Sequence, residues 1–285
     1  SRPVRVGNAA YRQLQLDIYG ELMDAIFLAS RRLGQPFKAV WSRLAAMTDW
    51  VCDNWRREDE GIWEVRGPKR EFLSSRLLCW VALDRAMRLA ADQSLPAPLD
   101  RWRAARDAIH ANIMSEFWNK EIGAFVQYRG AKALDAAVLL MPLLKFINPR
   151  DPLWQRTMKA VEERLVHDCL VYRYDNDASK LDDMAGEEGA FTTCSFWYVE
   201  CLARAGDLEQ ARFLFEKLLS YGNHVGLYSE ELSNSGAHLG NFPQALTHLA
   251  LISAACWLDD ALDRPATGAR SLEMAARAAR IAKEI

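Results

Sequence analysis

Apolar residues recur at intervals of three and four along almost the whole chain, whereas strict alternation of apolar and polar residues is hard to find. This spacing is typical of helices that turn one face toward a core. It predicts an all-α protein of about ten helices. The expected helices cover residues 9–33, 36–57, 71–92, 98–117, 133–146, 152–166, 188–205, 207–221, 241–262 and 268–284.

Two kinds of connection join these helices. The short kind is represented by Ala205-Gly206-Asp207, where glycine can end one helix and aspartate can cap the next. The long kind is rich in aromatic residues, acids and glycines and covers 58–70, 118–132, 170–187 and 222–240. Antiparallel helix pairs with a tight turn at one end produce such an alternation, so we expect the long loops to converge on one face.

Composition is that of a soluble globular protein with a sizeable core. The chain has 285 residues, of which 50% are hydrophobic and 26% charged. A net charge of -2 gives no electrostatic case for binding nucleic acid or an anionic membrane. No apolar run in the sequence approaches the roughly 18 residues that span a bilayer. We therefore expect one domain over 1–285, without a membrane or nucleic-acid partner.

Cysteine and histidine usage indicates neither disulfides nor metal. The six cysteines are scattered, mostly on apolar helical faces, and the five histidines form no His-x-x-x-His pair. Reduced core thiols in a cytoplasmic protein fit this pattern. Phosphate-binding glycine loops and a Gly-x-Ser-x-Gly elbow are also absent from the sequence. We expect no cofactor and no metal.

Candidate chemistry lies in two loops where an acid stands beside an aromatic residue between glycines, at 59–67 and 226–232. Inverting cleavage of a glycosidic bond needs a proton donor and a base on opposite faces of the sugar, roughly 6.5–9.5 Å apart. We expect Glu64 and Glu230 to face each other across one sugar pocket. Apolar surface from Trp63 disfavours a charged neighbour, which suits Glu64 as donor, while the polar setting of Glu230 suits the base.

Further candidates for sugar contacts carry structural alternatives. Arg173 could donate paired hydrogen bonds to vicinal hydroxyls, or it could form a salt bridge to Asp175 or Asp182. Glu187 and Glu188 open an expected helix, where capping explains one of them and hydroxyl binding the other, with Glu188 preferred. The remaining candidate contacts are aromatic neighbours of the two acids, namely Trp63, which could instead be a packed indole, and Tyr228.

Six segments in order along the chain resemble glycoside hydrolase family 15, the glucoamylase and bacterial trehalase-like enzymes. They are 61–67, 79–85, 171–174, 186–197, 226–231 and 240–245, and the opening 2–10 looks similar as well. The resemblance implies an (α/α)6 toroid and hydrolysis with inversion. The acid of the family's Trp-Glu motif, its proton donor, falls on Glu64, and the first acid after its Tyr-Ser pair, its base, falls on Glu230.

The chain also departs from that family. It has about ten of the twelve helices of the toroid, and the family's Asn-Trp-Asp-Tyr-Arg and Trp-x-Arg-Asp segment, which grips the non-reducing-end glucose, is missing from the sequence. We therefore expect the C-terminal part of a longer catalytic domain, lacking its first helices and ending in a tail helix at 268–284.

The resemblance implies an inverting hydrolase that cleaves α-linked glucose from a non-reducing end, acting on a small α-glucoside or oligosaccharide. Trehalose and maltooligosaccharides both stay open as substrates. Two alternatives remain. One is a catalytically inactive helical carbohydrate-binding or scaffold protein, and the other is a protein-interaction solenoid in which 58–70 and 222–240 lie far apart.

Overall fold

The computed structural model describes residues 7–34, 37–175 and 188–263, and nine α-helices lie within them. The predicted all-α class is confirmed, and the helix expected at 268–284 lies outside the described residues. The helices are α1 (Ile18–Leu33), α2 (Trp41–Asn54), α3 (Leu73–Asp92), α4 (Leu99–Glu116), α5 (Leu140–Leu143), α6 (Pro152–Leu165), α8 (Thr192–Ala205), α9 (Leu208–Leu219) and α10 (Ala245–Leu262), with 3-10 turns η1 (Ala9–Arg12) and η2 (Ala136–Leu139).

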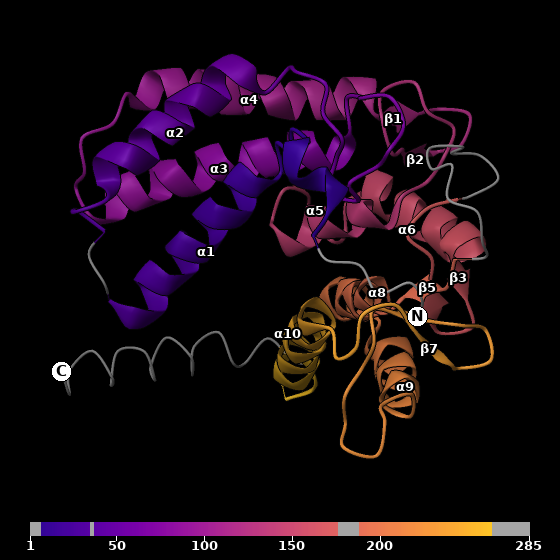
Figure 1. Ribbon diagram of the computed structural model, residues 1–285. Coiled ribbons are helices and arrows are strands. Elements are labelled where there is room, and N and C mark those ends of the chain that lie inside the picture. The colour runs from indigo at the N-terminus through magenta and orange to yellow at the C-terminus, as the bar shows by residue number, and fades with distance from the viewer. Residues whose placement is uncertain (1–6, 35–36, 176–187, 264–285) are drawn as a thin grey trace.

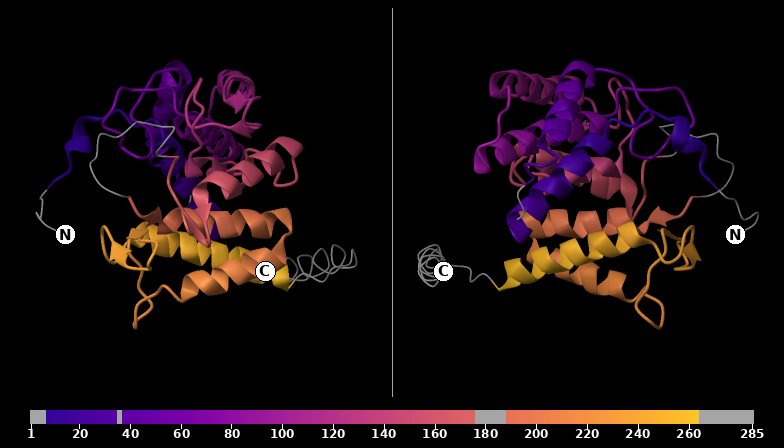
Figure 2. Two further views of the ribbon diagram at one scale, coloured as in Figure 1. Left: turned by 90° about the vertical axis from the view of Figure 1, so that its right-hand side faces the viewer. Right: turned by 60° about the vertical axis from the view of Figure 1, so that its left-hand side comes forward.

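The helices form a two-layered arc, which is an open part of an (α/α) toroid (Figure 1). Along the inner layer α1 lies against α3, η2 and α5 follow, and α8 lies against α10. Helices α2, α4, α6 and α9 cover this layer from outside, as the two further views also show (Figure 2). The alternation of inner and outer helices is what the short and long connections indicate in the sequence.

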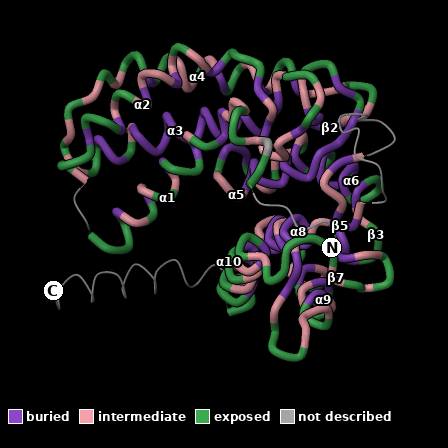
Figure 3. Tube along the Cα trace, in the orientation of Figure 1, coloured by how far each residue is buried: buried purple, intermediate pink, exposed green. Residues whose placement is uncertain are grey.

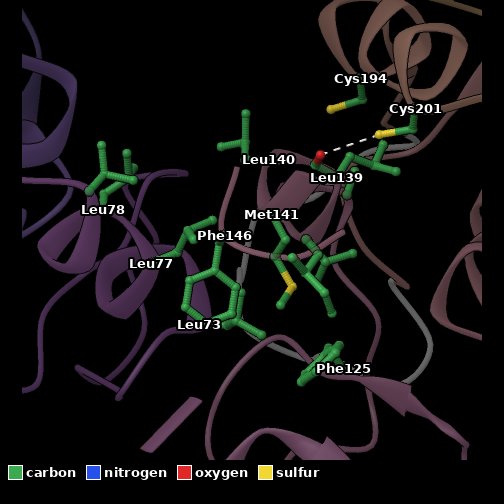
Figure 4. Packing of buried hydrophobic residues seen from close by; sticks show 14 of the residues in the cluster. Leu73, Leu77, Leu78, Phe125, Leu139, Leu140, Met141, Phe146, Cys194 and Cys201 are labelled. Carbon is green, nitrogen blue, oxygen red and sulfur yellow. Dashed lines mark hydrogen bonds between the residues drawn. The ribbon is translucent and has the colours of Figure 1, made fainter. Parts of the chain in front are cut away.

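Helix α3 forms the centre of the core. Its apolar residues extend nearly all round, and 16 of its 20 residues are buried. Figure 4 shows Leu73 and Leu77 facing Phe146, with Met141 nearby. Neighbouring residues cover α3 on every side, so it packs against both layers. Its first residue, Leu73, therefore holds the end of the preceding long loop in place.

Short antiparallel strands, which the sequence pattern did not predict, fasten the loops. They are β1 (Trp118–Asn119) with β2 (Ala124–Phe125), β3 (Val166–His167) with β4 (Leu170–Val171), and a three-stranded sheet of β5 (Ala190–Phe191), β6 (Glu231–Leu232) and β7 (His238–Leu239). Two residues are too few for a visible period of two. The helix expected at 188–205 therefore begins later, at Thr192, because Phe191 pairs with Glu231.

Helix α10, at one end of the arc, is exposed over much of its length (Figure 3). On α10, Leu246, Leu249 and Ile252 are 60%, 63% and 56% exposed. This helix is long and apolar enough to cross a membrane by length and hydropathy alone, with mean hydropathy 1.2 and 22% of its residues buried, so the expectation that no segment meets this test was wrong. In the structure α10 packs along α8 through Ala250 and Ala254.

Candidate active site

Main-chain hydrogen bonds fasten three of the long loops at their bases. Asp59 and Arg70 bridge the base of the first loop. Next along the chain, the amide of Ala136 donates to the carbonyl of Arg173 at 2.7 Å. Finally, the amide of Thr192 donates to the carbonyl of Glu230 at 3.0 Å. The loops at 58–70, 170–175 and 222–240 therefore each sit at the inner helix that carries or follows them, with little freedom of their own.

Glu64 sits in a tight turn with an uncommon backbone conformation. Its φ is 54°, in the left-handed region, which costs a residue with a Cβ about 1–3 kcal/mol and persists where the surroundings enforce it. The amide of Glu64 donates to the carbonyl of Gly61 at 3.2 Å. Gly61 has φ 70°, and a Cβ there would lie 2.8 Å from the ring of Phe72. Such strain clusters at functional sites, which draws attention to this acid.

Residues near the start of the described chain hold the outer side of this turn. The side chain of Asn8 donates from Nδ2 to Oε2 of Glu64 at 2.7 Å. Gln13 donates from Nε2 to the carbonyl of Val65 at 3.0 Å. The carboxyl of Glu64 is half-buried and accepts one side-chain hydrogen bond from the residues that the structure describes.

Trp63 connects this turn to the sheet whose strand β6 begins directly after Glu230. Its indole ring meets Phe191 edge-on with centroids 5.4 Å apart, and Trp197 at 6.3 Å. Phe191 pairs with Glu231 across β5 and β6. The contact between Trp63 and Phe191 therefore links the residue before Glu64 to the strand partner of Glu231, which follows Glu230. The two acids themselves are 166 positions apart in the sequence.

The carboxyl of Glu230 has a richer set of donors. Oε2 accepts from the amide and from the side-chain Nδ2 of Asn241, each at 2.9 Å, and Oε1 accepts from Nε2 of Gln244 at 3.3 Å. Gly240, at φ 71°, allows this approach, because a Cβ there would lie 2.7 Å from Oε2 of Glu230. These contacts fix the direction of the Glu230 carboxyl group.

Arg173 lies in an aromatic cage and pairs with a different acid from those expected. Its guanidinium is 4.9 Å from the ring centroid of Phe191 and 5.6 Å from that of Trp63. It forms an ion pair with Glu188, and its side chain is 10% exposed. Of the two acids expected as alternative partners, Asp175 pairs with Arg164, and Asp182 lies outside the described residues.

The other predicted contacts divide into three cases. Glu188 precedes β5 rather than capping a helix, and its carboxylate faces Arg173. Glu187 lies outside the described residues. Tyr228 is 3% exposed, and its hydroxyl donates to the carbonyls of Leu218 and Leu219 at 3.3 and 3.2 Å. These contacts make Tyr228 a packing residue, so we leave it out of the proposed sugar site.

Sequence reasoning missed Asp135, which lies directly under Trp63. Nε1 of Trp63 donates to Oδ1 of Asp135 at 2.8 Å, and Nε2 of Gln127 donates to Oδ2 at 3.1 Å. Burial raises the pKa of Asp135 to about 6, against the opposing effect of its hydrogen bonds and of Arg173. The sequence does carry a signal for Asp135, because an aspartate ahead of an apolar helical run is a common N-cap pattern. The expected helix at 133–146 placed this residue inside the helix instead.

Two further acids near the site have perturbed titration. Burial raises the pKa of Asp17 to about 6, and the negative charges of Asp59 and Glu64 add to this effect. Burial also raises the pKa of Glu231, whose Oε2 accepts from the amide of Gly189 at 3.1 Å. Among the described residues, no group of three or more His, Cys, Asp or Glu side chains is placed to hold a metal ion.

A comparison of sequences identifies the class of protein. Residues 1–256 match glycosyl hydrolases family 15, and the chain belongs to this family. It is 44% identical over 255 residues to a trehalase of Mycobacterium tuberculosis, in an alignment that covers 89% of this chain and 37% of that protein. The chain thus spans well under half the length of this curated relative.

Solved structures share the fold at low sequence identity. A wild-type glycosidase superposes with a TM-score of 0.76 at 19% identity, covering 90% of this chain and 70% of that one. A bacterial glucoamylase complexed with acarbose superposes with a TM-score of 0.70 at 13% identity, covering 87% of this chain and 41% of that one. These likenesses confirm the predicted toroid class of helical fold.

Proposed function

We propose that this chain carries both catalytic acids of an inverting glycoside hydrolase that cleaves α-linked glucose from a non-reducing end. Glu64 is the general acid and Glu230 the general base. Family membership supports the reaction class. The observation that carries the assignment is the edge-on contact of Trp63 with Phe191, which links the strained turn of Glu64 to the strand pair beside Glu230.

The surroundings of the two carboxyl groups differ. Glu230 accepts three hydrogen bonds from Asn241 and Gln244, which fix the direction of its carboxyl group. The carboxyl of Glu64 accepts one side-chain hydrogen bond, from Asn8, among the described residues, and the residue before it is an indole held against Phe191. The assignment of Glu64 as acid and Glu230 as base follows the family's motif positions.

The reaction follows from these roles. Glu64 gives its proton to the glycosidic oxygen as the bond from that oxygen to C1 breaks. A water molecule attacks C1 from the opposite face, and its proton passes to the Glu230 carboxylate. The products are β-glucose and the leaving alcohol. Glu64 is left ionised and Glu230 protonated, and proton exchange with solvent restores both. Arg173 and Glu188 offer a donor and an acceptor for sugar hydroxyls.

Trehalose is the first substrate to test. The relative that is 44% identical is named a trehalase, whereas the glucoamylase match at 13% identity reflects the fold alone. Maltooligosaccharides remain the second candidate. The rival function, an inactive carbohydrate-binding or scaffold protein, predicts sugar binding without glucose release.

The test measures glucose release from trehalose and from maltotriose, with the anomers of the first products followed by proton NMR. Inversion predicts β-glucose from the non-reducing end of maltotriose, and α- and β-glucose in equal amounts from trehalose, because its leaving alcohol is itself α-glucose. We expect a loss of about 10³-fold or more in kcat for Glu64→Gln and for Glu230→Gln. Glu231→Gln is the matched control, since Glu231 accepts from the Gly189 amide and should keep most activity. α-Glucose alone as the first product from trehalose would exclude inversion, and binding without release would favour the rival.

A further inference from the structure

We infer that Asp135 is a positioning residue that fixes the Trp63 indole and, through it, the direction of the Glu64 carboxyl. This inference rests on the proposed function, because it concerns how the proposed proton donor is held. It assigns a role in the site to a residue on the inner helical layer, 72 positions after Trp63 in the sequence.

The carboxyl of Asp135 is almost fully buried and fully engaged. It is 2% exposed, and its two oxygens accept three hydrogen bonds. The donors are Nε1 of Trp63 at 2.8 Å, the amide of Ala137 at 2.7 Å and Nε2 of Gln127 at 3.1 Å. Burying a charged carboxyl is unfavourable unless it is paired and hydrogen-bonded. The three donors around Asp135 therefore point to a role beyond capping one turn.

Helix capping alone does not explain the burial. Asp135 caps η2 by accepting from the Ala137 amide, but Asp151 caps α6 in the same way, accepting from the Leu153 amide at 2.8 Å, and is half-buried. Asp207 caps α9 and is exposed. What distinguishes Asp135 from these two caps is its pair of side-chain donors, Trp63 and Gln127.

The indole needs such an anchor. Trp63 is half-buried between Phe191, Trp197 and the guanidinium of Arg173, and these contacts alone leave an aromatic ring free to slide. A directional hydrogen bond from Nε1 selects one orientation. Because Glu64 follows directly in the left-handed region, a shift of Trp63 changes where its carboxyl points.

The network allows two substitutions that separate capping from anchoring. Asp135→Asn keeps an oxygen for both Trp63 and Ala137, and its new amide nitrogen can donate to Oε1 of Gln127, which has no hydrogen-bond partner among the described residues, once that amide turns over. Asp135→Ser keeps an N-cap oxygen but is too short to reach Trp63 as well.

The experiment compares kcat on trehalose for Asp135→Asn, Asp135→Ser, Trp63→Phe and the double variant Trp63→Phe with Asp135→Ser. We expect Asp135→Asn within about 3-fold of wild type, and Asp135→Ser and Trp63→Phe each reduced about 10- to 100-fold in kcat with little change in KM. The double variant should lose no more than the more impaired of the two single variants, because both changes break the same contact. Asp151→Ser makes the same change at the cap of α6 and is the control for that change; it should keep kcat.

A readout without turnover separates this inference from the proposed function. In ¹⁵N NMR, the Trp63 indole signal, assigned by its loss in Trp63→Phe, should shift with a midpoint near pH 6 in wild type and stay constant in Asp135→Asn. The inference is overturned if the Trp63 indole signal does not change when Asp135 is substituted, whether or not glucose is released. So does full kcat in Asp135→Ser, or independent, multiplicative losses in the double variant.

Discussion

The loops that carry Glu64 and Glu230 hold their acids in opposite ways. The first uses a left-handed backbone at the acid itself and a side chain, Trp63, anchored on a distant helix layer. The second keeps its acid next to a regular strand, and surrounds the carboxylate with donors from Asn241 and Gln244. Strain and apolar contact mark one site, and hydrogen-bond saturation marks the other.

The two loops thus give two glutamates different surroundings. The carboxyl of Glu64 follows an anchored aromatic ring and accepts one side-chain hydrogen bond among the described residues, while that of Glu230 accepts three. Four changes would break or sharpen the comparison.

The largest effect is expected from a change of leaving group. Fluoride departs without protonation, so α-glucosyl fluoride needs the base but not the acid. We expect Glu64→Gln to lose about 10³-fold in kcat on trehalose but less than about 10-fold on the fluoride, and Glu230→Gln to lose about 10³-fold on both. Initial-rate assays on the two substrates test this. Equal losses of Glu64→Gln on both would contradict the acid role.

A pH effect on stability comes next and concerns only the Glu64 side. The pKa of Asp135 is raised from 3.8 to about 6 in the folded protein. Its contribution to stability is therefore fully present below about pH 3.8 and is lost as pH rises through about 6. We expect Asp135→Asn to gain up to about 2–3 kcal/mol relative to wild type between these limits. Urea unfolding at several pH values measures this difference, and a constant gap would refute it.

Alanine at the two glycines should affect the two loops differently. Gly61→Ala drives a Cβ against the ring of Phe72, and Gly240→Ala drives one against the carboxylate of Glu230. Each forces a left-handed residue with a Cβ, which costs about 1–2 kcal/mol. We expect Gly61→Ala mainly to lower the melting temperature and Gly240→Ala mainly to lower kcat. Calorimetry and kinetics on both variants decide the matter, and identical profiles would count against it.

The last comparison concerns the side chains that touch the acids, and its smallest effect is expected at Asn8. Asn241→Ala removes one of three donors to Glu230, and a hydrogen bond to a charged group is worth about 1.5–3 kcal/mol. Asn8→Ala removes an exposed hydrogen bond to Glu64, worth about 0.5–1.5 kcal/mol. We therefore expect a larger fall in kcat/KM for Asn241→Ala. The reverse order would mean that the donor set of Glu230 does not matter to catalysis.

Much of the fold was predictable because helical periodicity is a local property. The expected helix at 71–92 appears as Leu73–Asp92, and that at 152–166 as Pro152–Leu165. The errors lie where the backbone conformation depends on a distant pairing partner. Ala190–Phe191 is one example, since it is a strand because β6 pairs with it. Short strands of this kind have no period of their own to recognise.

The sequence by itself determined the helical class and the family, since these follow from local spacing and motif, and it proposed the two acids between their glycines. Only the tertiary structure decided that Tyr228 packs inward, that Arg173 pairs with Glu188, and that Asp135 lies under Trp63. The physical reason is that side-chain partners come from segments far apart in the chain, and burial and direction exist only after those segments have met.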